Sequence, residues 1–303
     1  MCPPQGVLPR LWERRSLLSA EYSARITGMN ETIELIESRF SVRVFDKEPV
    51  PEETVRELKR LTLRAPSAGN MQLYSILEVK DQGKKEALAK LCDNQPMIAR
   101  APLVWLFLAD NHKWERYFLL SESDRKTGQP LRKAGLGDLH LTLQDAVIAA
   151  QNCAAAAQAL GLGSCYVGDV IENGEEMVKL FKLPPHAVPA CLLIMGRPAQ
   201  KKAKEDLSPR PGITSSIFME DSYEEPALER LDEQYEGHKA YFTKHHRIPK
   251  GELTNTADYY YNRKYTSAFM DEMNRSMGFY IRRYLSEDAL DDGLDEGEEG
   301  TED

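Results

Sequence analysis

The segment Arg39-Phe40-Ser41-Val42-Arg43 places two guanidinium groups and a hydroxyl within five residues. The planar fork of arginine matches a phosphate with two parallel hydrogen bonds, and a serine hydroxyl adds a further donor. Two interpretations stay open from these residues alone. The segment either holds a phosphate-bearing ligand or carries a pair of solvated surface arginines.

The composition of the chain limits the class of protein to which this segment belongs. The chain of 303 residues is 42% hydrophobic and 29% charged, as is typical of a soluble globular protein, and no apolar run approaches the roughly 20 residues that cross a membrane. Residues 286–303 contain ten acids and no base, so without them the net charge of −9 becomes +1. With no clustered basic face, this balance argues against nucleic acid as a partner.

The five cysteines form no Cys-x-x-Cys pair and the histidines no ligand spacing, which predicts reduced thiols and no metal site.

Apolar runs and turn residues predict the elements that position these side chains. Strands are expected over 73–79, 103–109, 163–168 and 188–195, and helices over 30–39, 52–65, 83–92, 139–160, 175–181, 225–244 and 257–285. Residues 111–126 give no clear pattern, and 127–137 are expected to form a mobile loop. The alanine run in the helix over 139–160 suits either plain core packing or a dimer interface. We expect one core with a helical C-terminal extension.

A dinucleotide-binding fold is excluded by the glycines near residue 161. Gly161 and Gly163 follow a helix and close it, whereas a dinucleotide-binding turn opens one. Tyr166 stands where that turn needs its third glycine.

Five segments occur in a fixed order over residues 31–213. They are Arg39 to Arg43, the loop Ala65-Pro66-Ser67-Ala68-Gly69-Asn70-Met71-Gln72, Ala149-Ala150-Gln151-Asn152 with Ala159 to Gly163, Tyr166-Val167-Gly168, and Gly196-Arg197-Pro198. This order and spacing resemble the FMN-dependent nitroreductase family. Asn94-Gln95-Pro96-Met97-Ile98 and Ser208-Pro209-Arg210 are similar to its oxygen-insensitive NADPH nitroreductase and NADPH–flavin oxidoreductase subgroup. The resemblance implies an α+β fold with a nitroreductase-like mixed β-sheet flanked by helices, extra C-terminal helices, and an interlocked homodimer with two FMN sites.

The resemblance also assigns cofactor-binding residues, position by position. The full set is Arg39, Phe40, Ser41, Val42, Arg43, Ser67, Asn70, Gln72, Gln95, Tyr166, Val167, Gly168, Asp169, Ser208 and Arg210. The arginines and Ser41 would hold the phosphate and ribityl chain, and the amides and Ser67 the ribityl chain or the polar edge of the flavin ring. Tyr166 to Asp169 would place a backbone N–H against flavin N5.

One position departs from the subgroup, which usually has lysine where this chain has Ser208. A phosphate-binding cation is therefore missing. Either Lys201, Lys202 or Lys204 replaces it, or the affinity for FMN is lowered.

The implied function is an FMN-dependent oxidoreductase. It would pass hydride from NADPH or NADH through the flavin to a nitroaromatic, quinone or flavin acceptor by a ping-pong mechanism, and no side chain need act as a nucleophile. Two alternatives stay open: a flavin-binding or regulatory protein without turnover, and a relative with reductive dehalogenase chemistry. The acceptor pocket is expected in the loops around 110–137 and 205–265.

The ends of the chain differ from its body. Residues 1–28 are expected to be a disordered or presequence-like arm before a natural start at Met29. Residues 29–285 form the FMN domain, with the helical extension over about 225–285, and residues 286–303 form an acidic disordered tail. A cytoplasmic homodimer is expected.

Overall fold

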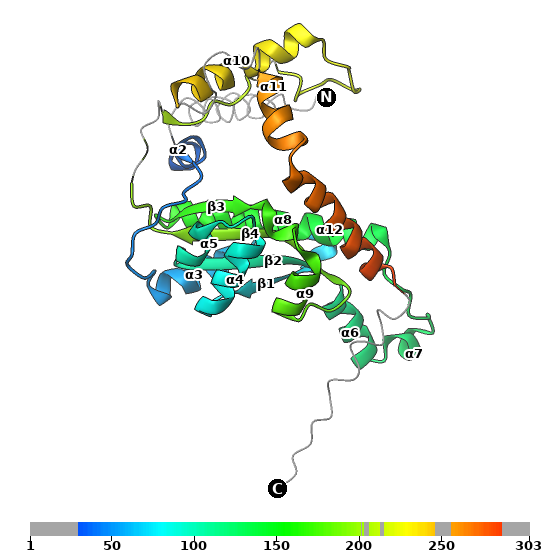
Figure 1. Cartoon of the computed structure of the whole chain (residues 1–303). Helices are drawn as coiled ribbons and strands as arrows, with labels where there is room; N and C mark the ends of the chain where they lie inside the picture. Colours follow the sequence, from blue (N-terminus) through cyan, green and yellow to red (C-terminus); the bar gives the residue numbers. More distant parts are fainter. Residues whose placement is uncertain (1–29, 201, 203–205, 213–214, 246–255, 287–303) are drawn as a thin grey trace, which may run out of the picture. The chain divides into compact units, whose positions relative to one another are not determined.

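The structure is a computed structural model that describes residues 30–200, 202, 206–212, 215–245 and 256–286 (Figure 1). The chain divides into two compact units, Met1–Arg39 and Phe40–Asp303. In the first unit, helix α2 (Glu31–Ser38) begins after Asn30, whose side-chain oxygen accepts a hydrogen bond from the backbone N–H of Ile33 at 3.0 Å. This N-cap satisfies one of the free donors at the start of the helix, and the helix expected here is confirmed.

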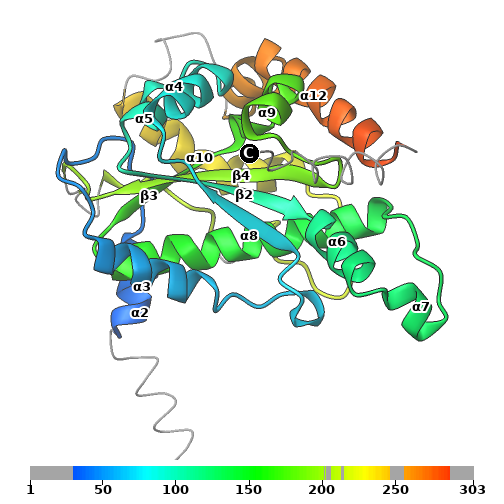
Figure 2. The same ribbon diagram turned by 90° about the horizontal axis from the view of Figure 1, so that it is seen from below.

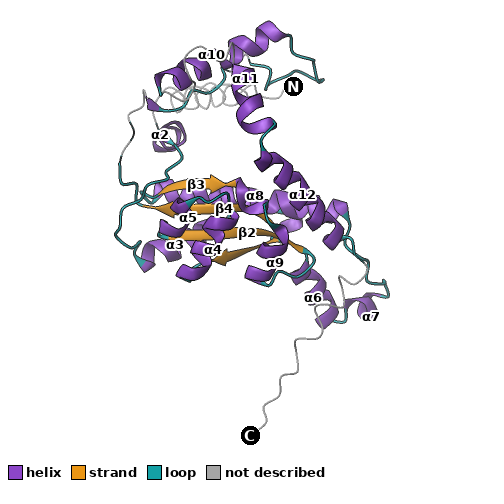
Figure 3. Ribbon diagram, viewed as in Figure 1, coloured by secondary structure: helices purple, strands orange, loops and turns teal. Residues whose placement is uncertain are grey.

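A four-stranded sheet forms the core of the second unit, with the order β1-β2-β4-β3 and antiparallel pairing between neighbouring strands (Figure 3). The strands are β1 (Tyr74–Glu78), β2 (Leu103–Asp110), β3 (Gly163–Val167) and β4 (Ala187–Gly196). All four expected strands are confirmed, because continuous apolar runs suit strands that are covered on both faces. Every pair among these strands is antiparallel, and an isolated parallel bridge between Ser41 and Ser164 lies outside them. With the flanking helices, this confirms the α+β fold.

One face of the sheet is covered by α8 (Leu136–Ala159) and α3 (Glu52–Thr62), as Figure 2 shows. The fully buried alanines of α8 are Ala146, Ala149, Ala150, Ala154 and Ala157. Their small side chains let the helix backbone approach Trp105, Phe107 and Leu193 of the sheet closely. The alanine-rich side of α8 is therefore core.

Four helices cover the opposite face (Figure 2): α4 (Gln82–Leu91), α5 (Pro96–Arg100), α9 (Gly174–Phe181) and α12 (Ala268–Tyr284). Leu88, Ile98 and Met177 from the first three pack into a second core with the sheet. The α9–α12 contact is close, because a Cβ on Gly174 would come within 2.7 Å of the Phe279 ring. The C-terminal helix is thus part of the folded core.

Residues 111–126, which give no clear sequence pattern, form α6 (His112–Leu120) and α7 (Ser123–Thr127). No residue of either helix is buried in the core. These short helices therefore lack the fully buried face on which most of the other helix predictions depend.

The helix expected over 225–244 is confirmed as α10 (Leu228–Lys244), but the single helix expected over 257–285 is wrong. It consists of α11 (Thr256–Tyr260), a π-helical turn η4 (Tyr261–Tyr265) and α12. The hydroxyl of Thr266 donates to Tyr261 O at 3.0 Å, and that of Ser267 donates to Lys264 O at 2.7 Å. These side chains compete for carbonyls that a continuous helix would use, which breaks the helix between η4 and α12.

Among the helices that the structure describes, none combines the length and apolar character needed to span a bilayer. The same part of the chain contains no group of three or more side chains suited to a metal ion. Cys92, Cys153, Cys165 and Cys191 are buried and form no disulfide bond, as expected. Burial raises the pKa of Cys153 to about 12, so this thiol stays protonated at neutral pH. The expected N-terminal arm and the acidic residues of the tail lie outside the described residues.

Candidate functional site

Residues 40–43, the predicted anion-binding segment, lie along the outer edge of β3, the last strand of the sheet. The backbone N–H of Val42 donates to Ser164 O at 2.9 Å. A Cβ on Gly163 would lie 2.4 Å from Val42 Cγ2, so this approach requires glycine. Val42 is buried, whereas Ser41 and Arg43 on either side of it are exposed, as the alternation of an extended segment dictates. A hydroxyl and a guanidinium are thus presented together at the sheet edge.

The loop after α3 joins three predicted flavin contacts in one hydrogen-bonded cluster. Gln72 Nε2 donates to Asn70 Oδ1 at 2.7 Å and to Ser67 Oγ at 3.3 Å, and the backbone N–H of Gln72 donates to the same hydroxyl at 3.0 Å. The loop passes through the turn η1 (Ala68–Asn70), where Gly69 has φ 56°. Asn70 and Gln72 are also left-handed, at φ 58° and 49°. Because non-glycine residues adopt this conformation at a cost, other contacts must hold the loop.

Asp145 on α8 supplies those contacts at both ends of the loop. Its Oδ1 accepts the backbone N–H of Ala68 at 2.9 Å, and its Oδ2 accepts that of Leu73 at 3.1 Å. The residue is 2% exposed, which strengthens such charge-assisted hydrogen bonds. Trp114 Nε1 adds a third contact by donating to Met71 O at 2.9 Å. The loop is held by groups from two other helices.

The sequence analysis missed Asp145. It is the only acid between residues 139 and 160, and an acid in an apolar helix needs buried partners, so a signal was available. Lys113 lies close by, and its ammonium donates to Tyr74 O. Burial lowers the pKa of Lys113, and the carboxylates of Asp110 and Asp145 partly offset that effect.

Gln95 and Tyr166, two predicted contacts of the flavin ring, lie at the ends of their elements. Gln95 directly precedes α5, and its half-buried side chain does not cap the helix. The hydroxyl of Tyr166 donates to Gln151 Oε1 on α8 at 3.3 Å. Neither residue shares a hydrogen bond with the cluster of Ser67, Asn70 and Gln72 within the described chain.

Three predicted flavin contacts, Val167, Gly168 and Asp169, follow one another at the end of β3. Val167 is buried, and Gly168 begins the turn η2 (Gly168–Ile171). A Cβ on Gly168 would meet no atom of the described residues within 4 Å, which leaves room for a ligand beside this backbone. Asp169 O accepts the backbone N–H of Glu172 at 3.0 Å.

Glu172 is a buried acid next to this turn. It is 6% exposed, and its Oε1 has no hydrogen-bond partner among the described residues. Burial, together with the charges of Asp169 and Asp93, raises the pKa of Glu172 to about 7. The end of β3 therefore carries a titratable group that the sequence analysis did not identify.

Arg210 and Ser208, the predicted second phosphate arm, lie against α10. Arg210 Nη1 donates to the carbonyls of Ser208 and Pro209 at 3.3 and 3.1 Å. Burial lowers the pKa of His238 on α10, and the charge of Arg210 lowers it further. Although both segments are described, no hydrogen bond or ion pair joins Arg210 to residues 40–43. Its role in phosphate binding stays a prediction.

Lys202 is the cation that the structure brings to the predicted anion-binding segment. Its ammonium lies 6.0 Å from the centre of the Phe40 ring. Lys201 and Lys204, the other expected replacements, lie outside the described residues. Arg39 is the last residue of the first unit, and its assignment stays a prediction.

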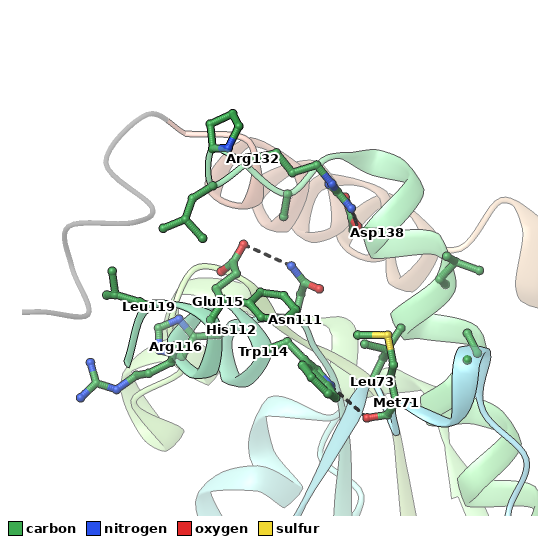
Figure 4. A pocket seen from close by; sticks show the side chains of 17 residues that line it. Met71, Leu73, Asn111, His112, Trp114, Glu115, Arg116, Leu119, Arg132 and Asp138 are labelled. Carbon is green, nitrogen blue, oxygen red and sulfur yellow. Dashed lines mark hydrogen bonds and ion pairs between the residues drawn. The ribbon is translucent and has the colours of Figure 1, made fainter. Parts of the chain in front are cut away.

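A pocket of about 700 Å³ opens between the loop after α3, helix α6 and the start of α8 (Figure 4). Apolar side chains that line it include Met71, Leu73, Trp114, Phe118, Leu131 and Leu141. Polar groups are fewer, and Figure 4 shows the side chains of Asn111 and Glu115 meeting inside it. The pocket includes part of the loop region 110–137, where an acceptor pocket was expected.

Glu115 is fixed by a buried chain of hydrogen bonds. Its Oε1 accepts Asn111 Nδ2 at 3.1 Å, and its Oε2 lies 2.6 Å from Nδ1 of the fully buried His186. Nε2 of His186 carries a proton, because its partner at 2.9 Å is Tyr284 O, which only accepts. His112 also lines the pocket, and burial lowers its pKa, which favours a neutral ring at pH 7.

Known proteins match this chain over most of the elements described. The family model of the nitroreductase family matches residues 36–197. The NAD(P)H-type FMN reductase of Bacillus subtilis is 31% identical over 185 residues, which cover 61% of this chain and 73% of the relative. The oxygen-insensitive NADPH nitroreductase of Salmonella typhimurium is 31% identical over 209 residues, 69% and 80% of the two chains. The solved structure of NfrA2 from B. megaterium has a TM-score of 0.70 at 25% identity and covers 82% of this chain and 98% of its own.

Proposed function

Because the chain belongs to the nitroreductase family, we propose that it is an FMN-dependent oxidoreductase that passes hydride from NAD(P)H to an electron-poor acceptor. The observation that carries this proposal is the family match over residues 36–197. That range contains the sheet-edge segment with Arg43, the loop held by Asp145 and the open backbone at Gly168. The named activities of the relatives, FMN reduction and NADPH-dependent nitro reduction, support the same reaction class.

The donors on the chain fit FMN in their chemistry. An exposed guanidinium and hydroxyl, Arg43 and Ser41, suit a phosphate, and the amides of Asn70 and Gln72 offer the donors and acceptors that the polar edge of a flavin ring needs. Bound FMN supplies the hydride exchange, and the protein binds and orients it. The task of Asp145 is to hold the amide-bearing loop in its strained conformation before the ligand arrives.

The acceptor is proposed to bind in the pocket beside that loop. Its volume of about 700 Å³ suits a one- or two-ring compound, and the indole of Trp114 favours a flat one. The amide of Asn111 has donor capacity for a quinone or nitro oxygen.

We also propose the interlocked homodimer. Apolar side chains on the outer side of α8 support it, since a stripe of this kind facing solvent marks an interaction surface. The exposed fractions are 55% for Leu136, 44% for Leu141, 47% for Val147 and 41% for Ile148. Sedimentation of the wild type against Val147→Asp tests this, with a dimer and a monomer expected. A wild-type monomer would rule it out.

The proposed FMN domain spans residues 29–285. A cytoplasmic location is proposed as well. Cys92, Cys153, Cys165 and Cys191 are buried and form no disulfide bond, which supports a reducing compartment.

Flavin content and steady-state turnover test the proposed function. The purified full-length chain should carry FMN or take it up, and should oxidise NADPH in the presence of quinones or nitroaromatics. A chain that cannot be loaded with FMN contradicts the proposal. A loaded chain that oxidises neither NADPH nor NADH with any acceptor would instead be a flavin-binding protein without turnover, and release of halide from a halogenated aromatic would identify a dehalogenase.

A further inference from the structure

Lys202 connects two parts of the second unit that are far apart in the sequence. Its ammonium lies 6.0 Å from the centre of the Phe40 ring and 6.0 Å from that of Tyr241. The Tyr241 hydroxyl is within 3.5 Å of the same ammonium. Tyr241 is 9% exposed and belongs to α10, so one side of the lysine rests on a fixed surface. The position of the charge is set by two aromatic rings.

The charge of Lys202 is not neutralised by the described part of the chain. No carboxylate there lies within ion-pair distance of its ammonium. Lys244, also on α10, differs in this respect, because it pairs with Asp206 at 3.1 Å. Lys202 is exposed and keeps hydrogen-bonding capacity for an anion.

Phe40 directly precedes Ser41 and lies three residues before Arg43, and these two residues are predicted to bind the phosphate. Ser41 and Arg43 are exposed, and the pairing of Val42 with β3 fixes their backbone. Lys202 therefore places an ammonium against the ring of the residue that directly precedes Ser41. At position 208 the chain has serine where lysine was expected, and Arg210 is hydrogen-bonded to its own segment.

From this placement we propose that Lys202 is a cofactor-binding residue whose ammonium contacts the phosphate of FMN together with Ser41 and Arg43. The proposal rests on the proposed function and adds the identity of the cation that replaces the lysine missing at position 208. The isoalloxazine ring takes no part in this contact.

Binding of two flavins to the full-length chain, freed of bound flavin, tests the proposal. Riboflavin carries the same ring as FMN but no phosphate, so a phosphate contact affects FMN alone. In Lys202→Gln the Kd for FMN should rise about tenfold, while the Kd for riboflavin should change less than about twofold. Lys202→Arg should restore most of the FMN affinity.

Lys264→Gln is the matched control, because Lys264 also lies over an aromatic ring, that of Phe269 at 5.4 Å. It removes the same charge elsewhere and should leave both affinities unchanged. Equal FMN affinity in Lys202→Gln and the wild type overturns the proposal. A parallel loss of FMN and riboflavin also overturns it, because Lys202 would then act through its packing on Phe40 and Tyr241. A wild type that binds neither flavin contradicts the proposed function itself, so the two failures are distinguishable.

Discussion

The loop after α3 and the sheet edge beside β3 carry the two halves of the predicted flavin site in opposite ways. In the loop, Asn70 and Gln72 bond to each other, and Asp145 and Trp114 hold the backbone around them. At the sheet edge only the backbone is fixed, and the side chain of Arg43 is exposed.

This difference fits the two ends of the proposed ligand. A flavin ring presents donors and acceptors in fixed directions, so its protein partners gain from being held in place beforehand. A phosphate is a charge with rotatable oxygens, and long cationic side chains can close on it after it arrives. We therefore expect changes in the loop to affect the folded state, and changes at the edge to affect ligand binding.

The largest effect is expected from Asp145→Ala. It leaves the N–H groups of Ala68 and Leu73 without their acceptor in a buried place, which should lower the free energy of unfolding by about 3 kcal/mol. Urea unfolding of the flavin-free chain measures this. Asp81→Ala is the control, because this exposed N-cap accepts the N–H of Lys84 at 2.7 Å and should cost only about 1 kcal/mol. Equal losses in the two variants would show that the loop does not depend on Asp145.

Glu172 is a second test of this comparison, because it is buried like Asp145 but its Oε1 has no hydrogen-bond partner among the described residues. Its pKa rises on folding from the ordinary value of 4.5 to about 7, so its contribution to stability is complete below pH 4.5 and is lost as the pH rises through 7. Glu172→Gln should remove this loss. Its free energy of unfolding, relative to that of the wild type, should be about 2 kcal/mol higher at pH 8 than at pH 4.5. Urea unfolding at both pH values measures it, with Glu176→Gln on the exposed side of α9 as the control. An unchanged pH dependence in Glu172→Gln would contradict the raised pKa.

Arg43→Ala tests the sheet edge. Loss of one charge-assisted contact should lower the affinity for FMN about tenfold and leave the free energy of unfolding of the flavin-free chain within about 0.5 kcal/mol of the wild type. Fluorescence titration with FMN and urea unfolding supply the two readouts. Arg64→Ala, another exposed arginine, should change neither. Normal FMN affinity in Arg43→Ala would remove this residue from the site.

Trp114→Phe is expected to give the smallest effect. It keeps a ring in the pocket but removes the hydrogen bond to Met71 O, which should lower the free energy of unfolding by about 1 kcal/mol. Because the same ring lines the pocket, the KM for a quinone should rise more than kcat falls. Tyr117→Phe, on the exposed side of α6, should change neither constant. A KM equal to that of the wild type would place the acceptor elsewhere.

Local patterns predicted the strands and most of the helices, because these elements bury apolar runs. Helix α6 buries none of its residues, and the break at Thr266 depends on hydroxyl-to-carbonyl bonds that periodicity does not register. The order of motifs pointed to the family.

The residues that hold or complete the candidate site could not be predicted from local sequence patterns. Asp145 is separated from Ala68 and Leu73 by 77 and 72 residues, and Lys202 lies far along the chain from Phe40. These contacts arise when strands and helices pack, and no local pattern encodes them. Ser208 indicated that either one of three lysines replaces the missing cation or the affinity for FMN is lowered, but it did not distinguish between these outcomes.

Anaerobic stopped-flow absorbance of the FMN-loaded chain tests the proposed function most directly. On mixing with NADPH, the visible flavin band should bleach at a rate that saturates with NADPH concentration, and a quinone added afterwards should restore the band in full. A band that NADPH and NADH both leave unchanged would contradict hydride transfer in this protein.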